Sequence, residues 1–336
     1  MSNPISCVNR IGSSTVFAAL CAALVLLLSL SGCNKDHAAN TVTSKPVVMC
    51  TTLPLYCVAA QVAGEAATVE LLPAPQKGPH AYQFTLRDRE RLSRANVILQ
   101  NGFGLESPDL TRFIAERATA GVVVAAAGDS IPEGKRRQAG QCTCVHHNHG
   151  HDAEDDEDKP AHKGWDAHIW LGRIGMLAMV DSAEAALKQA APKSAAVFEA
   201  NATQTRTRIN TEFDEAKVKL APLKGRKLLT FHDAWGYFAE EFGFQTIGAM
   251  TEAGETVTIK NIEAVRKQIR NGKIRVIFAE PQYDGSMMRT LAKEEGASVA
   301  ILDPCEQTSA ALTPETYFTI LRSNVATLVT ALAEAP

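Results

Sequence analysis

The chain has 336 residues, of which 46% are hydrophobic and 21% are charged, and its formal net charge is −3. This length and composition are ordinary for a soluble globular protein with two domains or one large domain. The nearly balanced charge gives no reason to expect a nucleic acid as a partner.

Residues 1–33 have the pattern of an export signal that ends in a lipid-modified cysteine. Arg10 precedes the apolar run Val16–Leu30, which is followed by two small residues and Cys33. The run is short for a membrane-spanning helix and is typical of a signal peptide. The end of the run, Leu-Ser-Gly-Cys, resembles the bacterial lipobox. We therefore expect Cys33 to carry a lipid that anchors the mature protein to a membrane, on the periplasmic or outer-surface side. The polar residues 34–45 are expected to form a flexible tether.

The region 46–191 alternates apolar strands with helices. Strands are expected at 47–52, 68–72, 96–102 and 121–127, and helices at 56–64, 86–95 and 170–190. Continuous apolar strands that alternate with helices favour a parallel sheet covered on both faces. The region is therefore expected to form a first α/β lobe.

An irregular insertion at 128–164 interrupts this lobe. It has no apolar periodicity, so we expect its middle to be disordered in the absence of metal. An acidic run, Asp152–Asp158, lies among cysteines and histidines that can bind transition metals. The alternative is a solvated acidic run without a specific role. The candidate accessory ligands are Cys142, Cys144, His146, His147, His149, His151 and His162.

The cysteines of the mature region give little support for a disulfide framework. Five remain after Cys33, so at least one is free or bound to metal. An oxidising compartment permits a disulfide between Cys50 and Cys57, but the sequence does not establish it. Cys142 and Cys144 are too close in sequence to pair easily with each other.

The α/β pattern restarts after one long helix. Pro192 is a helix-start signal, and no proline or glycine interrupts Lys193–Leu220. Apolar residues are sparse along this helix, which predicts packing on one side, through Phe198, Ile209, Phe213, Val218 and Leu220. Strands are expected beyond it at 227–231, 244–250, 275–280 and 298–303, with helices between them at 235–243, 259–272 and 286–296. The predicted fold is two α/β lobes, each with a mainly parallel sheet, joined by a long helix at 192–221; the second lobe is 222–336.

Four residues that can bind metal, two from each predicted lobe, lie where their side chains could meet at one site. His80 follows the second expected strand, His232 follows the strand 227–231, and Asp303 ends the last strand, while His168 follows the insertion. Ligands of open α/β sheets bind at the carboxyl ends of the strands, so these side chains can converge between the lobes. Three imidazoles and a carboxylate suit tetrahedral Zn²⁺ without excluding Mn²⁺. Spacing alone leaves open an ordinary structural role for each histidine, because the set contains no compact motif.

An enzyme is the less favoured interpretation of this set. A catalytic zinc usually keeps an open position for water, whereas a fourth protein ligand favours binding without turnover. Glu280 also ends a strand. It could be the base of a zinc hydrolase, but its position better suits a carboxylate that orients a ligand from behind.

Several motifs resemble those of the metal-binding solute receptors of bacterial ABC importers for zinc and manganese. They include GPHAYQFTLRDRERLSRANVILQNGFGLE, DAHIWL, LLTFHDAWGYFAEEFGF, FAEPQY and LDP, and the resemblance runs from Val47 to the C-terminus. It implies two lobes joined by a rigid helix, with a metal held between them by His80, His168, His232 and Asp303. Within this family a histidine at the position of His232, together with a His-rich acidic loop, goes with zinc. Glutamate at that position goes with manganese.

The chain also departs from the family pattern at three positions. Ala167 and Gly172 stand where the family usually has proline and aspartate, so the loop around His168 is expected to differ. Pro79 precedes His80, and the adjacent glutamate of some zinc receptors is therefore absent.

The function predicted from the sequence is a lipid-anchored, monomeric receptor that delivers Zn²⁺ to an ABC permease, without catalytic activity. The insertion is expected to be an accessory metal collector beside the main site. The alternatives are a manganese receptor, a metal-dependent adhesin or storage protein, and, less favoured, a zinc hydrolase.

Overall fold

The computed structural model describes residues 45–139, 164–251, 257–283 and 285–333, all of them in one compact unit, Lys45–Pro336. The predicted signal peptide, Cys33 and nearly all of the tether lie outside the described residues, as do all seven candidate accessory ligands of the insertion. Among the described residues, no helix is both long enough and apolar enough to cross a membrane.

The first lobe contains a four-stranded parallel sheet with the order β2-β1-β3-β4. All four predicted strands are present, as β1 (Val47–Cys50), β2 (Thr68–Leu71), β3 (Val97–Gln100) and β4 (Val123–Ala126). The helices of this lobe are α2 (Leu53–Ala63), α3 (Leu86–Ser93), α4 (Pro108–Thr119) and α5 (Arg173–Ala190).

The second lobe repeats this strand order with a second parallel sheet, β6-β5-β7-β8. Its strands are β5 (Lys227–His232), β6 (Gln245–Thr251), β7 (Val276–Ala279) and β8 (Ser298–Ile301). Its helices are α7 (Gly236–Phe242), α8 (Ile259–Gly272), α9 (Ser286–Glu294) and α10 (Thr316–Ala333). The predicted fold class, two α/β lobes each with a parallel sheet, is therefore confirmed.

Short 3-10 helices complete the described elements. Two of them position candidate metal ligands. Helix η2 (Pro79–Ala81) contains His80, and η6 (Ile169–Leu171) directly follows His168. The others are η1 (Gly64–Ala66), η3 (Ala127–Ser130), η4 (Glu133–Lys135), η7 (Pro192–Ser194) and η8 (Ala221–Leu223).

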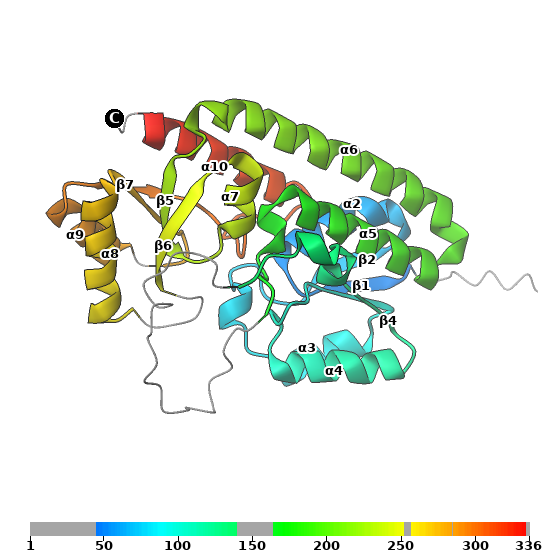
Figure 1. The fold of residues 1–336 in the computed structure, drawn as a ribbon. Coiled ribbons are helices and arrows are strands. Elements are labelled where there is room, and N and C mark those ends of the chain that lie inside the picture. The colour runs from blue at the N-terminus through cyan, green and yellow to red at the C-terminus, as the bar shows by residue number, and fades with distance from the viewer. Residues whose placement is uncertain (1–44, 140–163, 252–256, 284, 334–336) are drawn as a thin grey trace, which may run out of the picture. The chain divides into compact units, whose positions relative to one another are not determined.

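Helix α6 (Ala195–Leu220) connects the lobes and contacts helices of both, α2 and α5 in the first and α7 and α10 in the second (Figure 1). Pro192 starts η7 rather than α6 itself. The helix buries one stripe at three- and four-residue spacing, which is the pattern of a helix that packs on one side. Val218 was expected on this stripe but is 75% exposed, because it lies between the buried Ala216 and Leu220. The stripe consists of Phe198, Ala202, Thr205, Ile209, Phe213, Ala216 and Leu220.

The largest hydrophobic core is continuous through both lobes. Val48 and Leu99 of the first sheet and Leu228 and Phe278 of the second belong to the same cluster of buried side chains. Neighbouring residues on each strand point to the opposite face, where each sheet has a smaller cluster of its own. The junction between the lobes is therefore part of the main core.

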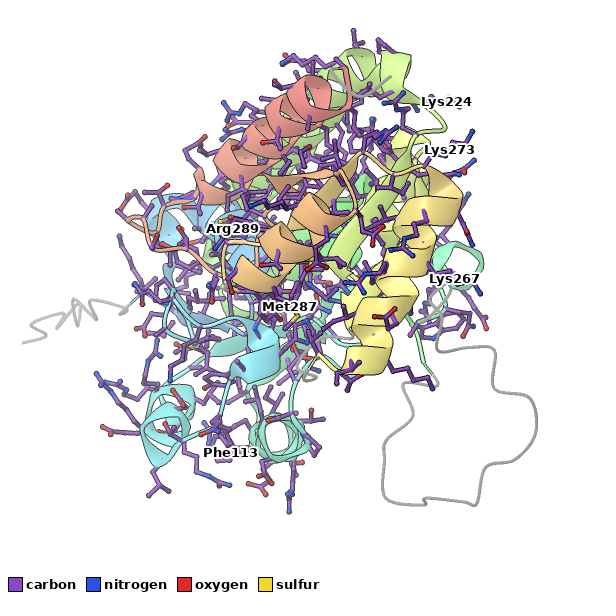
Figure 2. The ribbon with its side chains drawn as sticks, turned by 90° about the vertical axis from the view of Figure 1, so that its left-hand side faces the viewer. Phe113, Lys224, Lys267, Lys273, Met287 and Arg289 are labelled. Atoms are coloured by element: carbon purple, nitrogen blue, oxygen red, sulfur yellow. The ribbon has the colours of Figure 1, made fainter. Side chains whose placement is uncertain are left out.

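Helices α4 and α10 have no counterpart in the sequence-based predictions. For α4 a signal was present, because Ser107 caps the helix by accepting a hydrogen bond from the backbone N–H of Leu110, and Pro108 follows it. The side chain of Phe113 on α4 lies between α3 and α4, while Lys267 of α8 and Lys273, which directly follows α8, are exposed (Figure 2).

Gly175 allows η6 to lie directly against the first turn of α5. A Cβ atom at this position would lie 1.9 Å from the carbonyl oxygen of Ile169. We predict that Gly175→Ala lowers the free energy of unfolding by about 3 kcal/mol, because backbone must move to relieve the overlap. Gly134→Ala is the matched control, since a Cβ there meets nothing within 4 Å. Equal stabilities of the two variants in chemical denaturation would contradict this packing argument.

Candidate metal centre

Three histidines and a glutamate converge between the two sheets, in the one metal-compatible cluster found among the described residues. His80 lies in η2 and His168 immediately precedes η6, while His232 is the last residue of β5 and Glu306 follows β8. Their ligand atoms all lie within 4.8 Å of one another. All but His80 are buried, and the His80 side chain is 18% exposed.

The spacing of these atoms matches four ligands around one small cation. Nε2 of His168 lies 3.2 Å from Nε2 of His80 and 3.4 Å from Nε2 of His232. Oε1 of Glu306 lies 3.2, 3.3 and 3.8 Å from Nε2 of His80, His232 and His168. Ligands about 2.0–2.1 Å from a tetrahedral zinc are separated by roughly 3.3 Å. Oε1 of Glu306 is buried and accepts no hydrogen bond of good geometry from the described residues, so the group has room for a cation as its partner.

Asp303, the predicted fourth ligand, does not belong to this cluster. Its Oδ1 accepts a hydrogen bond from the backbone N–H of Cys305 at 2.8 Å, and its own backbone N–H and C=O are bound by the side chain of Asn324. Cys305 adopts a left-handed conformation, with φ of 60°. Directly after this turn, the side chain of Glu306 lies within 3.3 Å of Nε2 of both His80 and His232. The sequence analysis missed Glu306, although it is an acidic residue close behind a strand end.

The pairing of β5 with β7 places a carboxylate directly behind His232. Thr230 is opposite Phe278 in this parallel register, so His232 and Glu280 are opposite each other two residues further along. Both carboxylate oxygens of Glu280 lie 2.7 Å from Nδ1 of His232. A carboxylate at Nδ1 fixes the proton there and directs Nε2 toward the cluster. This contact matches the orienting role considered for Glu280 in the sequence.

His168 is held by contacts from both lobes. Oδ1 of Asp166 lies 3.0 Å from its Nδ1 and also accepts a hydrogen bond from its backbone N–H at 3.0 Å. Asn101, at the end of β3, donates to the carbonyl of Ala167 at 2.9 Å. The indole of Trp170 donates to the carbonyl of Pro304 at 2.6 Å, which ties the segment of His168 to the turn that carries Glu306.

A proton on His232 offsets part of the negative charge of the carboxylates in and beside the cluster. Burial disfavours a cation at His232, but the carboxylates of Glu280 and Glu306 outweigh it and raise the pKa of His232 to about 10. Burial opposes charge at Glu306 as well, yet His232 and His80 hold the pKa of Glu306 far below its usual range. Burial lowers the pKa of His80. At neutral pH, His232 therefore carries a proton that a bound metal ion must displace.

The described cysteines, Cys50, Cys57 and Cys305, are all buried free thiols. The disulfide that the sequence permitted between Cys50 and Cys57 is therefore not formed. Burial raises the pKa of Cys57 to about 12, so it remains a thiol at neutral pH.

Comparisons with known proteins identify the family of this chain. The family model described as zinc-uptake complex component A, periplasmic, matches residues 48–331. The chain belongs to this family. The resemblance to receptors of metal importers is thus confirmed. Members of this family are described as a component of an uptake complex. This description agrees with the prediction that the protein is not an enzyme.

Individual relatives are named as manganese-binding or as zinc-binding proteins. The manganese-binding lipoprotein MntA of Bacillus subtilis is 25% identical over 290 residues, which cover 84% of this chain and 87% of the relative. The zinc-binding protein AdcA of Streptococcus pyogenes is 24% identical over 298 residues and 84% of this chain, but this match spans only 55% of AdcA. The structure of the solute-binding protein FpvC of Pseudomonas aeruginosa, in complex with Mn²⁺, superimposes with a TM-score of 0.73 at 21% identity. It covers 87% of this chain and 100% of FpvC and shows a shared fold.

Glu280→Gln should lower the pKa of His232 in the metal-free protein. The change removes a negative charge at Nδ1, which is expected to lower this pKa by about 1–3 units. Wild-type His232 stays protonated until the pH approaches its pKa of about 10, so the variant should lose this proton at lower pH. NMR titration of the histidine rings measures the change. Glu294→Gln on α9 is the control. The Glu294 side chain is 53% exposed, and its replacement should leave the titration of His232 unaltered. An identical His232 titration in Glu280→Gln would contradict the assigned contact.

Proposed function

We propose that the protein is an extracytoplasmic receptor that captures Zn²⁺ and delivers it to an ABC permease. His80, His168, His232 and Glu306 are its ligands, two from each half of the chain. The observation that carries this proposal is the spacing of three Nε2 atoms and one buried carboxylate oxygen at tetrahedral distances.

Zinc is favoured over manganese by the chemistry of these ligands. Three imidazole nitrogens and one oxygen suit zinc, whereas manganese prefers a shell richer in oxygen. His232 also stands where the resemblance assigns histidine to zinc receptors and glutamate to manganese receptors. Manganese is the second candidate, because Glu306 supplies a carboxylate and the relative MntA is named for manganese binding.

The four-ligand set supports capture and release rather than hydrolysis. A catalytic zinc needs a position for water, and here a fourth protein ligand occupies the corner where that water would bind. Glu280 is not available as a base, because both of its oxygens contact Nδ1 of His232.

We infer that the protein is attached to a membrane, and both the N-terminal sequence and the relatives support this. The lipobox at Leu30–Cys33 supports a lipid on Cys33, and MntA is named a lipoprotein. The family description places its members in the periplasm. A monomer tethered in this way delivers its cargo to a permease in the same membrane. The insertion would collect metal beside the main site, through its histidines and the two cysteines Cys142 and Cys144.

Glu306→Gln and Asp303→Asn separate the proposed ligand from its neighbour. Glu306→Gln should weaken zinc binding by more than about 100-fold, because a neutral amide replaces a charged ligand in a buried site. Asp303→Asn should bind zinc almost as the wild type does, since its side-chain oxygen can still accept from Cys305. Competition titration against a zinc chelator measures both affinities. Loss of tight binding in Asp303→Asn alone would return Asp303 to the ligand set.

Deleting residues 142–162 tests the accessory role of the insertion. The deletion should leave one tight zinc site and lower the total zinc bound, because the four proposed ligands lie outside the deleted segment. Metal analysis after equilibrium dialysis gives the stoichiometry, and chelator competition gives the affinity. If the deletion abolished the tight site, the insertion itself would be the site. Several comparable sites in the wild type would instead indicate a storage protein.

A further inference from the structure

Arg137 lies in the described first part of the insertion, where the chain pairs with the residues that follow the insertion. Gln138 and Trp165 form an isolated antiparallel bridge. The backbone N–H of Asp166 donates to the carbonyl of Arg137 at 2.8 Å, and that of Ala139 donates to Gly164 at 2.8 Å. Arg137 is therefore fixed to the segment that leads into His168.

The same residue reaches across to the second lobe. Its backbone N–H donates to the hydroxyl of Tyr237 at 3.0 Å, and its Nη1 donates to Oε2 of Glu240 at 3.3 Å. Both partners belong to α7. Gly236 leaves the space that the guanidinium fills, because a Cβ atom there would lie 2.6 Å from Nε of Arg137. The start of α7 is thus shaped to admit this side chain.

Arg137 is connected to the metal centre through one carboxylate. Its Nε lies 3.6 Å from Oδ2 of Asp166, and the side chains of Arg137 and Asp166 are only 19% and 9% exposed. The other oxygen of Asp166, Oδ1, holds Nδ1 of His168 at 3.0 Å. The contact of Arg137 with Asp166 is an ion pair beyond hydrogen-bond distance, and Nε of Arg137 donates no hydrogen bond among the described residues. A series of ion pairs and hydrogen bonds therefore joins Glu240, Arg137, Asp166 and His168. Since Arg137 neutralises Asp166 from the outer side, this carboxylate can remain buried while it orients the imidazole.

We propose that Arg137 is a positioning residue for the metal site, which rests on the zinc-binding function proposed above. It holds Asp166 in place, so that Nε2 of His168 faces the cluster, and it does so from a contact that also joins the first lobe to α7. The opposing interpretation is that Arg137 only fastens the lobes together. In that case its loss lowers stability without changing how His168 binds metal.

Arg173 provides a matched control for this test. It also joins the first lobe to α7, through Nε to Oε1 of Glu241 at 3.2 Å. A second contact runs from its Nη2 to Oδ1 of Asp214 on α6 at 2.6 Å. None of these partners contacts a proposed ligand. Removing Arg173 therefore breaks a contact between lobe and helix without disturbing Asp166.

The test compares Arg137→Met, Arg137→Lys and Arg173→Met in the full mature chain. The probes are Zn²⁺ competition with a chelator, the visible absorption spectrum of bound Co²⁺, and thermal unfolding of the metal-free protein. Arg137→Met should lower zinc affinity by about 10- to 100-fold and alter the Co²⁺ spectrum, as loss of a partner that orients a ligand does. Arg137→Lys keeps the positive charge and should recover part of the affinity, whereas Arg173→Met should change only thermal stability.

The possible outcomes separate this inference from the proposed function. If wild-type protein shows one tight site and Arg137→Met retains its affinity and Co²⁺ spectrum, the positioning role is wrong while the receptor function stands. If the wild type itself shows no tight site, the proposed function fails first. Should Arg137→Met not fold, Arg137→Gln replaces it, because it keeps a polar side chain but loses the charge that faces Asp166. If Arg137→Gln has the affinity and Co²⁺ spectrum of the wild type, together with a lowered melting temperature like that of Arg173→Met, the proposal is wrong.

Discussion

The structure depends on holding four side chains that can bind a metal ion close together in a largely buried place. Three imidazole nitrogens and one carboxylate oxygen, from His80, His168, His232 and Glu306, are crowded between the two sheets. Burial of such groups is costly unless charge is balanced. In the metal-free protein, the proton on His232 provides part of this balance between Glu280 and Glu306. A divalent cation bound there, such as the Zn²⁺ proposed above, would supply more positive charge at the same place and release the proton. Binding would therefore relieve an electrostatic cost that the fold already bears.

The remaining features of the site keep the ligands from relaxing away from this arrangement. His232 and His168 each have a carboxylate at Nδ1, Glu280 and Asp166 respectively. The first of these contacts follows from strand register, because β5 and β7 are paired. The second depends on an irregular segment, which is held by Asn101 and by the pairing beside Arg137. Regular structure thus positions one histidine, and a network of side chains positions the other.

The parts of the molecule that the sequence made predictable are those with a regular period. Eight apolar strands, the long helix and three histidines at strand ends or after the insertion could be read from local pattern. Glu306 could not, because its direction depends on the turn made by Asp303 and the left-handed Cys305. Val218 is a different case, because its spacing from Phe213 and Leu220 already places it off the buried stripe of α6 and only its apolar character suggested burial. Asp166 opens the motif DAHIWL, but the motif alone does not show that its carboxylate holds Nδ1 of His168. Arg137 carries no motif, and its importance comes from contacts with residues far apart in the chain.

The continuous core makes it unfavourable to divide the chain between the lobes. Side chains of both sheets, together with α6 and α10, belong to one cluster of buried apolar residues. A fragment that ends between the lobes would expose the apolar side chains that now meet at the junction, and such surfaces promote aggregation. The lobes repeat the same strand order, yet they are not separable modules. Exchange of one lobe between related receptors would require the junction residues to be exchanged with it.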